Sequence, residues 1–411
     1  MRLPIEFCEQ VIQLWEACRK ESCVCPSYCI HYWLARPLLE LTLLLQLEPI
    51  TELVSLIIIT LQLYSSAVAP YIAPSLISIA METCYDVGIP RFNNHNPGDP
   101  TDESWIKLSR NIPTARILSL LYMTALGCAA SLPVAGGVTA PISDFWSEVH
   151  VQFVLMLLSP KHPIEDYIVM LRLLCTSVFP QSIGPTPPGQ TAEFAAVHII
   201  QSVSLQLVDT PRWDIDRVTL HGLRIEILKT LVAFARSEFG LVQMATGDYV
   251  VPRLVTLLCA SVEELYDGTM QQHTPPAPTT ATASKPTAST SAAVSAGHLL
   301  SSKNNPAAPR AFEQELLNER LSSLLAHTML LLHTLVRSPA TRDAVDLPAK
   351  LGRVLGGPQK YLLTLARLNF ADTDAGGVVA EDTAELAHEL LELAVTEDEG
   401  AELGVYFGGL A

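Results

Sequence analysis

Apolar residues recur every three or four positions along most of the chain, and this spacing limits the fold more than any other feature. An α-helix turns once every ~3.6 residues, so residues spaced in this way lie on one side of a helix and form a buried stripe. No alternation of apolar and polar residues lasts long enough to predict a β-sheet. The sequence therefore predicts an all-α protein. The clearest stripes are Ile164, Tyr167, Ile168, Leu171, Leu174 and Val178, then Leu220, Leu223, Ile227, Leu231 and Phe234, then Leu317, Leu321, Leu324, Thr328, Leu331 and Leu335.

Prolines mark the places where many of these periodic segments begin. A proline in the first turn of a helix loses no hydrogen bond, because the N–H groups there have no helical acceptor. The sequence therefore predicts a succession of helices joined by turns. It shows no pattern that would indicate a single compact core. Such a succession predicts antiparallel helix pairs stacked as an α-solenoid of the HEAT or armadillo type, although the repeats show no regular sequence period. The prolines are Pro49, Pro90, Pro113, Pro163, Pro211 and Pro252.

One segment differs in composition from the rest and divides the chain into three parts. Between about Asp267 and Arg310 the residues are mainly Pro, Thr, Ala and Ser, which bury too little apolar surface to become ordered. A strong helical pattern resumes afterwards, so the segment interrupts one array and does not separate independent domains. We predict a helical-repeat region over residues 1–266, a disordered insertion over 267–311, and C-terminal helices that continue the array over 312–411.

The charge of the chain argues against a nucleic-acid surface. The net charge is -16, whereas phosphate binding requires clustered Lys and Arg side chains that displace counterions. Part of the negative charge is local, because nine Asp or Glu and no Lys or Arg lie between Glu381 and Glu402. That run is typical of a solvated helix face. We expect no direct contact with nucleic acid.

Two long uncharged segments raise the alternative of an integral membrane protein. The first, Leu53 to Met81, is long enough to cross a bilayer, but Pro70 and Pro74 are expected to split it into pieces of about one core helix each. The second, Ile117 to Ser143, carries several Gly and Pro residues in its later half and resembles a helix followed by a loop. Neither is flanked by the excess of Lys and Arg that sets membrane topology. We therefore predict buried core helices and no membrane span.

The cysteines indicate a reducing compartment. Nine are scattered along the chain, and the N-terminal residues lack the long apolar stretch of a secretory signal. The densest group is Cys18, Cys23, Cys25 and Cys29, with His31 nearby. Its gaps of four, one and three residues differ from the Cys-x2-Cys pairs of zinc knuckles, and the surroundings are apolar. We predict buried free thiols and no metal site.

No motif in the chain indicates catalysis or a bound cofactor. The glycine-rich loops that hold phosphates, the G-x-S-x-G elbow of hydrolases and the H-E-x-x-H helix of metalloproteases are all missing from the sequence. The eleven histidines are dispersed and have no placed partner. No pair of acid, base or nucleophile can be brought together from the sequence, so we predict a protein that is not an enzyme and takes no cofactor.

Two groups of residues are candidates for contact with a protein partner. Near the C-terminus, Glu385, Glu389 and Glu392 share one helix face, opposite Leu386, Leu390 and Leu393. These carboxylates form either a partner-facing patch or the solvated side of an amphipathic last helix. The second group is aromatic: Phe145 and Trp146 open a helical segment that continues to Phe153, where burial in the core is the alternative to an interface.

The segment from Asp144 to Pro185 resembles the fungal members of the ATR-interacting protein (ATRIP) family. The matching features are a Phe-Trp helix start, a Phe-Val-Leu-Met run, a Pro-Ile turn with an acidic residue, and a Thr-Ser stretch that ends in Gly-Pro. Ile183 departs from the pattern, which usually has an aromatic residue there. The later segments that begin at Leu220 and Val250 also resemble this family. The matching residues are Phe145, Trp146, Phe153, Val154, Leu155, Met156, Pro163, Ile164, Asp166, Leu171, Thr176, Ser177, Gly184 and Pro185.

The resemblance implies a regulatory subunit without chemistry of its own. Such a subunit binds the N-terminal helical repeats of the ATR-type checkpoint kinase, a phosphatidylinositol-3-kinase-like protein kinase, in the nucleus. It thereby links the kinase to single-stranded DNA coated with replication protein A. The acidic recruitment segment and coiled coil of the family are not visible here, so we expect the C-terminal helical part of such a protein. The resemblance adds Asp166 to the candidate partner residues. An unrelated helical-repeat adaptor in trafficking or transport is the alternative.

Overall fold

The computed structural model describes residues 2–21, 49–93, 114–131, 140–186, 189, 191–209, 215–272, 307–342, 344–371 and 379–394. Nearly all of these residues are helical, which confirms the predicted all-α class. The helices are α1 (Arg2–Glu21), α4 (Pro49–Asn93), α6 (Thr114–Ala130), α7 (Pro141–Glu148), α8 (Val151–Leu157), α9 (Ile164–Leu174), α10 (Ala192–Leu205), α11 (Arg217–Phe234), α12 (Glu238–Thr246), α13 (Val250–Gln272), α14 (Ala307–Arg337), α15 (Leu347–Leu351), α16 (Gly357–Asn369) and α17 (Glu381–Ala394).

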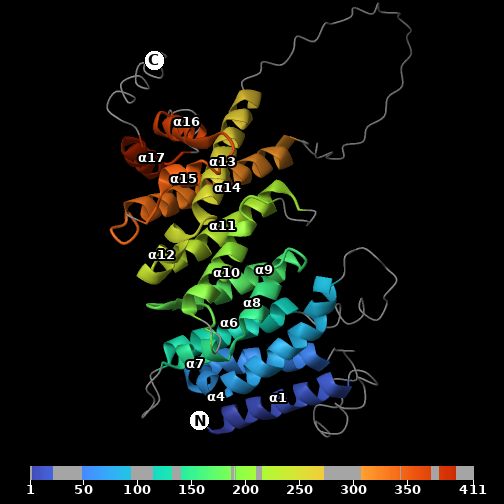
Figure 1. Ribbon diagram of the computed structural model, residues 1–411. Coiled ribbons are helices and arrows are strands. Elements are labelled where there is room, and N and C mark those ends of the chain that lie inside the picture. Colours follow the sequence, from blue (N-terminus) through green and yellow to red (C-terminus); the bar gives the residue numbers. More distant parts are fainter. Residues whose placement is uncertain are drawn as a thin grey trace, which may run out of the picture.

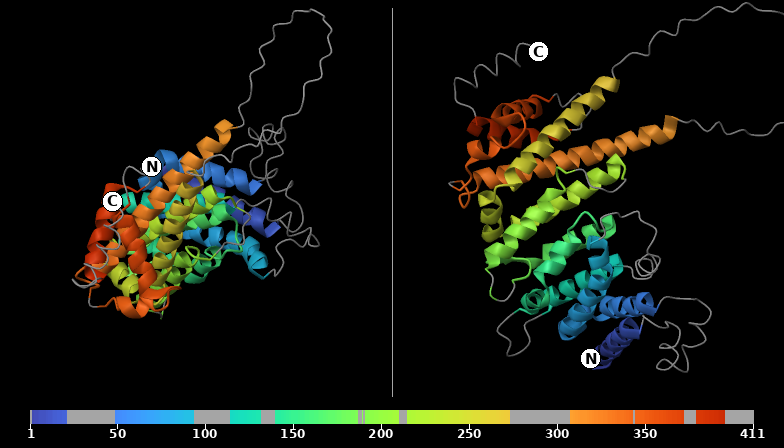
Figure 2. Two further views of the ribbon diagram at one scale, coloured as in Figure 1. Left: turned by 90° about the horizontal axis from the view of Figure 1, so that it is seen from above. Right: turned by 45° about the vertical axis from the view of Figure 1, so that its right-hand side comes forward.

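The helices are stacked in sequence order from α1 at one end to α16 and α17 at the other (Figure 1). Each layer contacts the next, in the order α1, α4, α6, α9, α11, α14 and α17, and the right-hand view in Figure 2 shows the same succession. The buried apolar residues of all these helices form one continuous cluster. This arrangement is the α-solenoid that the periodic stripes predict.

A short hairpin lies between α9 and α10 and was not expected from the sequence. After the single 3-10 turn Cys175–Ser177, strands β1 (Val178–Phe179) and β2 (Ser182–Ile183) pair antiparallel. Val178 lies opposite Ile183, and Phe179 lies opposite Ser182. Strands of two residues are too short to show an alternating pattern, so the sequence gives no signal for them.

Helix α1 closes one end of the stack. Its inner face packs on α4, and its outer face carries the exposed residues Glu6, Glu9, Gln13 and Glu16. Leu3 and Phe7 are also exposed on this helix, so its exposed side carries both polar and apolar residues. Arg19 anchors the helix by ion pairs with Glu82 and Asp86 of α4. The buried residues of α1 are Cys8, Val11, Ile12, Trp15 and Cys18.

Helix α4 corrects the prediction for the long uncharged segment. The helix is interrupted at Tyr64, whose φ and ψ are -136° and 31°, and not at Pro70 or Pro74. Both prolines therefore lie inside the second part of the helix. In the described part of the chain, Ile50–Ile89 is the one helix long and apolar enough to cross a membrane, a test that the core helix of a soluble protein also passes. The absence of a membrane span stays a prediction.

The C-terminal helices are joined to the repeats by a buried lysine. Lys350 of α15 is 6% exposed, and its ammonium group donates hydrogen bonds to the carbonyl oxygens of Ala245 and Gly247 at the end of α12. The nitrogen–oxygen distance to Gly247 is 2.6 Å. A cation there is stabilised by the negative end of the helix dipole. Burial lowers the pKa of Lys350.

The ends of the predicted insertion are helical. Helix α13 extends to Gln272 and α14 begins at Ala307, so both helices reach into the predicted 267–311 segment. Residues 273–306 between them lie outside the described residues, and their predicted disorder stays a prediction.

Candidate protein-binding surface

The predicted aromatic residues lie in the core. Phe145 and Trp146 on α7 are 1% and 2% exposed, and their rings meet edge to face with centroids 5.7 Å apart. Phe153 on α8 is fully buried and packs in the same way on Tyr85 of α4, at 5.8 Å. Asp166, in the first turn of α9, is also buried, at 3% exposure. Side chains this buried can influence a partner only through the surface that they support.

The polar residues of the segment that resembles the ATRIP family are joined by hydrogen bonds. The indole N–H of Trp146 donates to the hydroxyl of Thr176 at 3.2 Å, which ties α7 to the end of α9. The hydroxyl of Ser177 accepts a hydrogen bond from the N–H of Gly184 at 3.0 Å and closes the hairpin. Gly184 has a φ of 74°, and a Cβ at this position would collide with Ile199. These residue types are therefore required by the local fold.

Phe145 also lines a small pocket between α4 and α7. The pocket has a volume of about 130 Å³, and its walls are mostly apolar. Asp144 and Glu148, one helical turn apart on α7, are exposed at its side. The pocket brings one predicted residue close to the surface. Its other lining residues are Pro70, Ala73, Pro74, Ile77 and Pro141.

The acidic face of α17 is only partly free. Glu385 and Glu392 are exposed, and Glu392 lies 3.2 Å from His388 on the same helix, whereas Glu389 pairs with His333 and Arg337 of α14 at 2.8 and 3.4 Å. The hydrogen bond from His333 lowers the pKa of Glu389. Glu389 thus holds the last helix on α14, and the role of these three glutamates toward a partner stays a prediction.

The apolar face of α17 differs from the prediction at one position. Leu393 is 52% exposed, while Leu391 is buried with Leu390. The buried stripe continues from Thr383 and Ala387, and Leu386 is half-buried. The helix is therefore rotated relative to the expected Leu386, Leu390 and Leu393 stripe.

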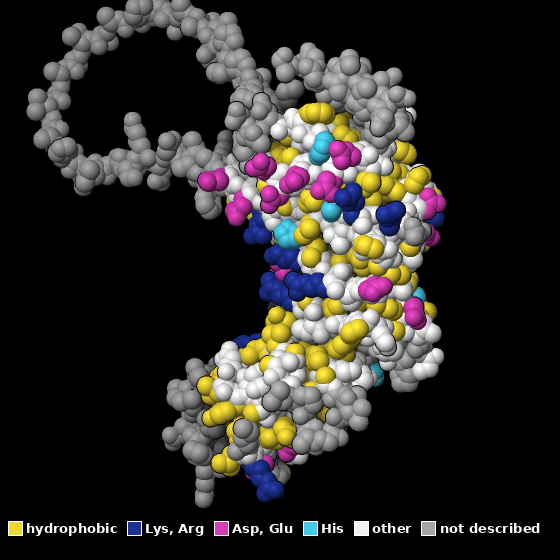
Figure 3. All heavy atoms as spheres, turned by 90° about the vertical axis from the view of Figure 1, so that its left-hand side faces the viewer, with side chains coloured by type: hydrophobic (Ala, Val, Ile, Leu, Met, Phe, Trp, Pro, Cys, Tyr) yellow, Lys and Arg dark blue, Asp and Glu magenta, His cyan; other side chains and the backbone are white. Residues whose placement is uncertain are grey.

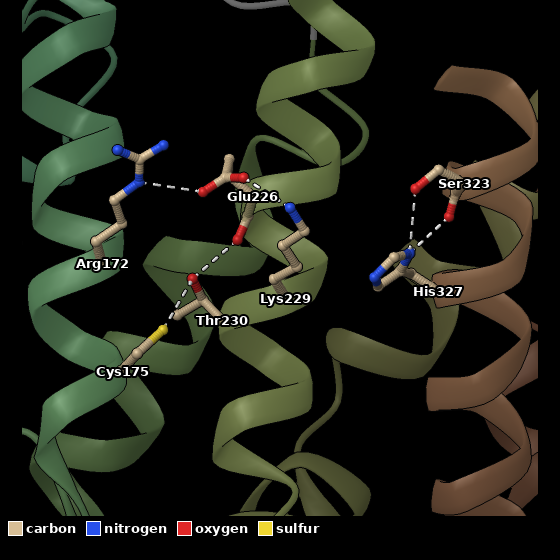
Figure 4. A network of polar contacts seen from close by, with 7 residues as sticks. All are labelled: Arg172, Cys175, Glu226, Lys229, Thr230, Ser323 and His327. Atoms are coloured by element: carbon tan, nitrogen blue, oxygen red, sulfur yellow. Dashed lines mark hydrogen bonds and ion pairs between the residues drawn. The ribbon is translucent and has the colours of Figure 1, made fainter. Parts of the chain in front are cut away.

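A charged row that the sequence analysis missed lies across α9 and α11. The carboxylate of Glu226 on α11 pairs with Arg172 on α9 at 3.3 Å and with Lys229 one turn later at 3.0 Å (Figure 4). Burial raises the pKa of Glu226, but hydrogen bonds and charges from Lys229 and Arg172 outweigh burial and hold it below its ordinary value. The carboxylate is thus ionised and shared between two cations.

Two more cations extend this row. Arg320 on α14 is exposed and lies over Gly222 of α11, where an added Cβ would be 3.6 Å from the Arg320 guanidinium nitrogen. Arg236, just after α11, is exposed and lies close enough to the Cys175 thiol for its charge to act on it. The thiol itself is 3.8 Å from the Thr230 hydroxyl, which also joins the end of α9 to α11. We refer to Arg172, Lys229, Arg236 and Arg320 as the cationic row.

The surface of the molecule is hollowed at this level. Figure 3 shows a curved outline in which Lys and Arg side chains gather at the hollow, at the height of α9 and α11, while Asp and Glu side chains gather above it. The curvature of an α-solenoid creates an extended concave surface of this kind, which such proteins use for binding. The concave face is therefore the candidate functional site.

A second ionic cluster is structural and lies between α11 and α13. The buried His221 is 3.3 Å from Glu264, which also lies 4.0 Å from Arg217. The hydrogen bond with His221 is the main cause that lowers the pKa of Glu264. Arg224 is half-buried beside the same carboxylate, and burial lowers its pKa. The cluster fixes α13 on α11.

Most of the predicted cysteine group lies outside the described residues. Cys18 is buried and carries no disulfide, whereas Cys23, Cys25, Cys29 and His31 lie outside the described residues. Within the ranges that the structure describes, no three His, Cys, Asp or Glu side chains are grouped so as to hold a metal ion.

A curved stack of helices with a charged concave face defines a helical-repeat scaffold. Models of the Rad26-like helical repeats and the Rad26-like C-terminal domain match residues 79–336 and 345–407. The chain belongs to the Rad26-like family. It is similar to the crystal structure of Myceliophthora thermophila Rad26 (residues 373-841), with 34% sequence identity and a TM-score of 0.72 over 96% of this chain and 87% of that chain. No curated protein sequence matches significantly.

Proposed function

We propose that this protein is a non-catalytic regulatory subunit that docks on an ATR-type checkpoint kinase in the nucleus. The observation that carries the proposal is the Rad26-like match over residues 79–336 and 345–407, which together span most of the described helices. The resemblance of residues 144–185 to the ATRIP family supports the same reading. The protein would thereby connect the kinase indirectly to single-stranded DNA coated with replication protein A.

The mechanism of such a subunit is positional. A solenoid presents a long surface with a fixed shape, so it can hold a much larger partner without chemistry of its own. Any effect on the kinase then requires different contacts with its active and inactive states, because a ligand shifts an equilibrium only by its differential affinity.

The proposal includes the organisation of the chain. Residues 1–266 and 312–411 form one continuous array, interrupted by the 267–311 insertion, and correspond to the C-terminal helical part of a checkpoint subunit. Contacts that cross between the two regions support this, because α11 and α13 pack on α14, and α13 packs on α16. Among the predicted partner residues, Glu385 and Glu392 are exposed and accessible to a partner.

The test is affinity purification of the tagged chain from nuclear extract, followed by mass spectrometry of the bound proteins. Recovery of an ATR-type kinase in stoichiometric amount is the expected result. A soluble, folded chain that recovers no such kinase, even after extension upstream of Met1, would contradict the proposal.

Two alternatives would show themselves in the same preparation. Recovery of trafficking or transport proteins would favour the adaptor. Retention of the chain in the membrane pellet after carbonate washing would favour a membrane protein.

A further inference from the structure

We infer that the cationic row on the concave face binds an acidic segment of a protein partner. The row lies on three helices that are successive layers of the stack, α9, α11 and α14, so its charges follow the direction of the solenoid axis. An extended or helical segment that lies along the hollow would meet them one after another. The inference concerns this surface and holds whether or not the partner is a kinase.

The first argument is local charge. The whole chain has 26 Lys and Arg against 42 Asp and Glu, yet two cations of the row, Arg172 and Lys229, share a single carboxylate, Glu226. Their side chains are accessible: Arg172 and Lys229 are 55% and 52% exposed, and Arg236 and Arg320 are also exposed. A surface on which exposed cations outnumber carboxylates concentrates ligands of negative charge.

The second argument is shape. Gly222 lies on α11 beneath Arg320, and the Arg320 guanidinium is the one group within 4 Å of a Cβ built at this position. Leu220 and Val218, its neighbours on the same helix, are only half-buried. An acidic partner residue that pairs with Arg320 would therefore lie close to the backbone of α11 and near the other cations of the row.

The third argument separates a protein segment from a nucleic acid. Glu226 lies within the row, and Glu315 and Glu319 on α14 are exposed near Arg320 in the sequence. A phosphate backbone is negative along its whole length and would meet these carboxylates with repulsion. A protein segment can place a Lys or an apolar residue opposite each carboxylate and acidic residues opposite the cations. The mixed pattern of charge thus favours a protein.

The experiment measures fluorescence anisotropy of the full chain with three labelled probes of equal length. They are a glutamate-rich peptide, a lysine-rich peptide and single-stranded oligodeoxythymidine. We expect saturable binding of the glutamate-rich peptide, which weakens as salt increases because the contacts are exposed. Arg172→Glu with Lys229→Glu is expected to reduce its affinity about tenfold or more, and Glu226→Gln is expected to increase it about two- to threefold.

The matched control is Arg342→Glu, which reverses an exposed charge in the turn after α14 and should leave the affinity unchanged. Circular dichroism and thermal unfolding show that each variant is folded, and all replaced side chains except Glu226 are exposed. Equal affinity of the glutamate-rich peptide for all variants would overturn the inference. Tighter binding of oligodeoxythymidine, lost in the same double variant, would overturn it in favour of a nucleic-acid surface. Because the probes contain no kinase, failure here is distinct from failure of the kinase pull-down.

Discussion

The hydroxyl of Ser131 lies 2.7 Å from the carbonyl oxygen of Ser66, an acceptor that Pro70 leaves without its helical donor. In a regular helix the N–H of residue 70 would donate to this oxygen, but proline has no N–H. Ser131 follows directly after α6, so the neighbouring layer supplies a donor for the carbonyl oxygen that has no partner within α4. The hydroxyl also lies 2.6 Å from the carbonyl oxygen of Gly127, and its single hydrogen serves one acceptor at a time.

Replacing Ser131 by Ala is expected to destabilise the protein by about 0.5–1 kcal/mol, the lower part of the usual range for one hydrogen bond, because the Ser66 acceptor is exposed and water can replace the hydroxyl. The reason is specific to Pro70, because only a proline leaves the Ser66 oxygen unpaired. In a Pro70→Ala background the new N–H can donate to Ser66, and Ser131→Ala should then have little effect. Urea unfolding of the two single variants and the double variant gives the coupling energy. Equal effects of Ser131→Ala in both backgrounds would show that the Ser66 contact contributes nothing.

Two helical glycines are expected to respond in opposite directions to the same substitution. At Gly127 on α6, a Cβ would lie 2.7 Å from the Cβ of Ala69 and 3.0 Å from the backbone oxygen of Ser65 on α4. Gly127→Ala should therefore force α4 and α6 apart and destabilise the protein by about 1–3 kcal/mol.

At Gly222 on α11 the same change meets only Arg320, at an ordinary 3.6 Å. Gly222→Ala should stabilise the protein by up to about 1 kcal/mol, because Ala has the higher helix propensity. Thermal unfolding of Gly127→Ala and Gly222→Ala measures both expected changes in stability. A loss of stability in Gly222→Ala as large as that in Gly127→Ala would contradict the packing described here.

The sequence predicts the fold well because the information for it is local. Leu171, Leu231 and Leu324 are buried where the three- and four-residue spacing places them. The spacing alone leaves the rotation of a helix open by about one residue, which is why Leu393 was expected inside and Leu391 is found there. For α17, contacts with α14 and α16 decide the rotation, and these contacts are not encoded in the helix itself.

The candidate site could not be predicted for a related reason. Arg172, Lys229 and Arg320 lie in three separate apolar stripes, far apart in the sequence. Only the stacking of their helices brings them onto one face. The contact at Pro70 is similar, because the carbonyl oxygen of Ser66 that this proline leaves unpaired meets the hydroxyl of Ser131, 65 residues away from Ser66. Phe145 and Trp146 show the opposite case. The sequence singles them out as candidate partner contacts, and the packing of α7 buries them in the core.

Replacing Lys350 by Met is expected to weaken the attachment of the C-terminal helices. The apolar stem is retained, but the carbonyl oxygens of Ala245 and Gly247 lose their buried donor, at a cost of about 1–3 kcal/mol. Hydrogen exchange should become faster in α15 and at the end of α12. Lys360→Met is the control, because Lys360 pairs at the surface with Glu263 at 2.9 Å and such pairs contribute about 1 kcal/mol at most. Unchanged exchange in α15 of Lys350→Met would exclude a role for the ammonium group in this attachment.

The link between α11 and α13 should make stability depend on acidic pH through Glu264. Hydrogen bonding with His221 lowers the pKa of Glu264 in the folded protein. A carboxyl group with a lowered folded pKa contributes stability that is fully present above its unfolded pKa, about 4.3, and is lost as pH falls through the lower folded value. Glu264→Gln should therefore unfold at a lower temperature than wild type at pH 7, and the gap should narrow below about pH 4.3. Glu319→Gln, which removes an exposed carboxylate on α14, should follow the wild type at every pH. A gap for Glu264→Gln that stays constant from pH 7 to pH 3 would mean that the charge of this carboxylate does not stabilise the contact.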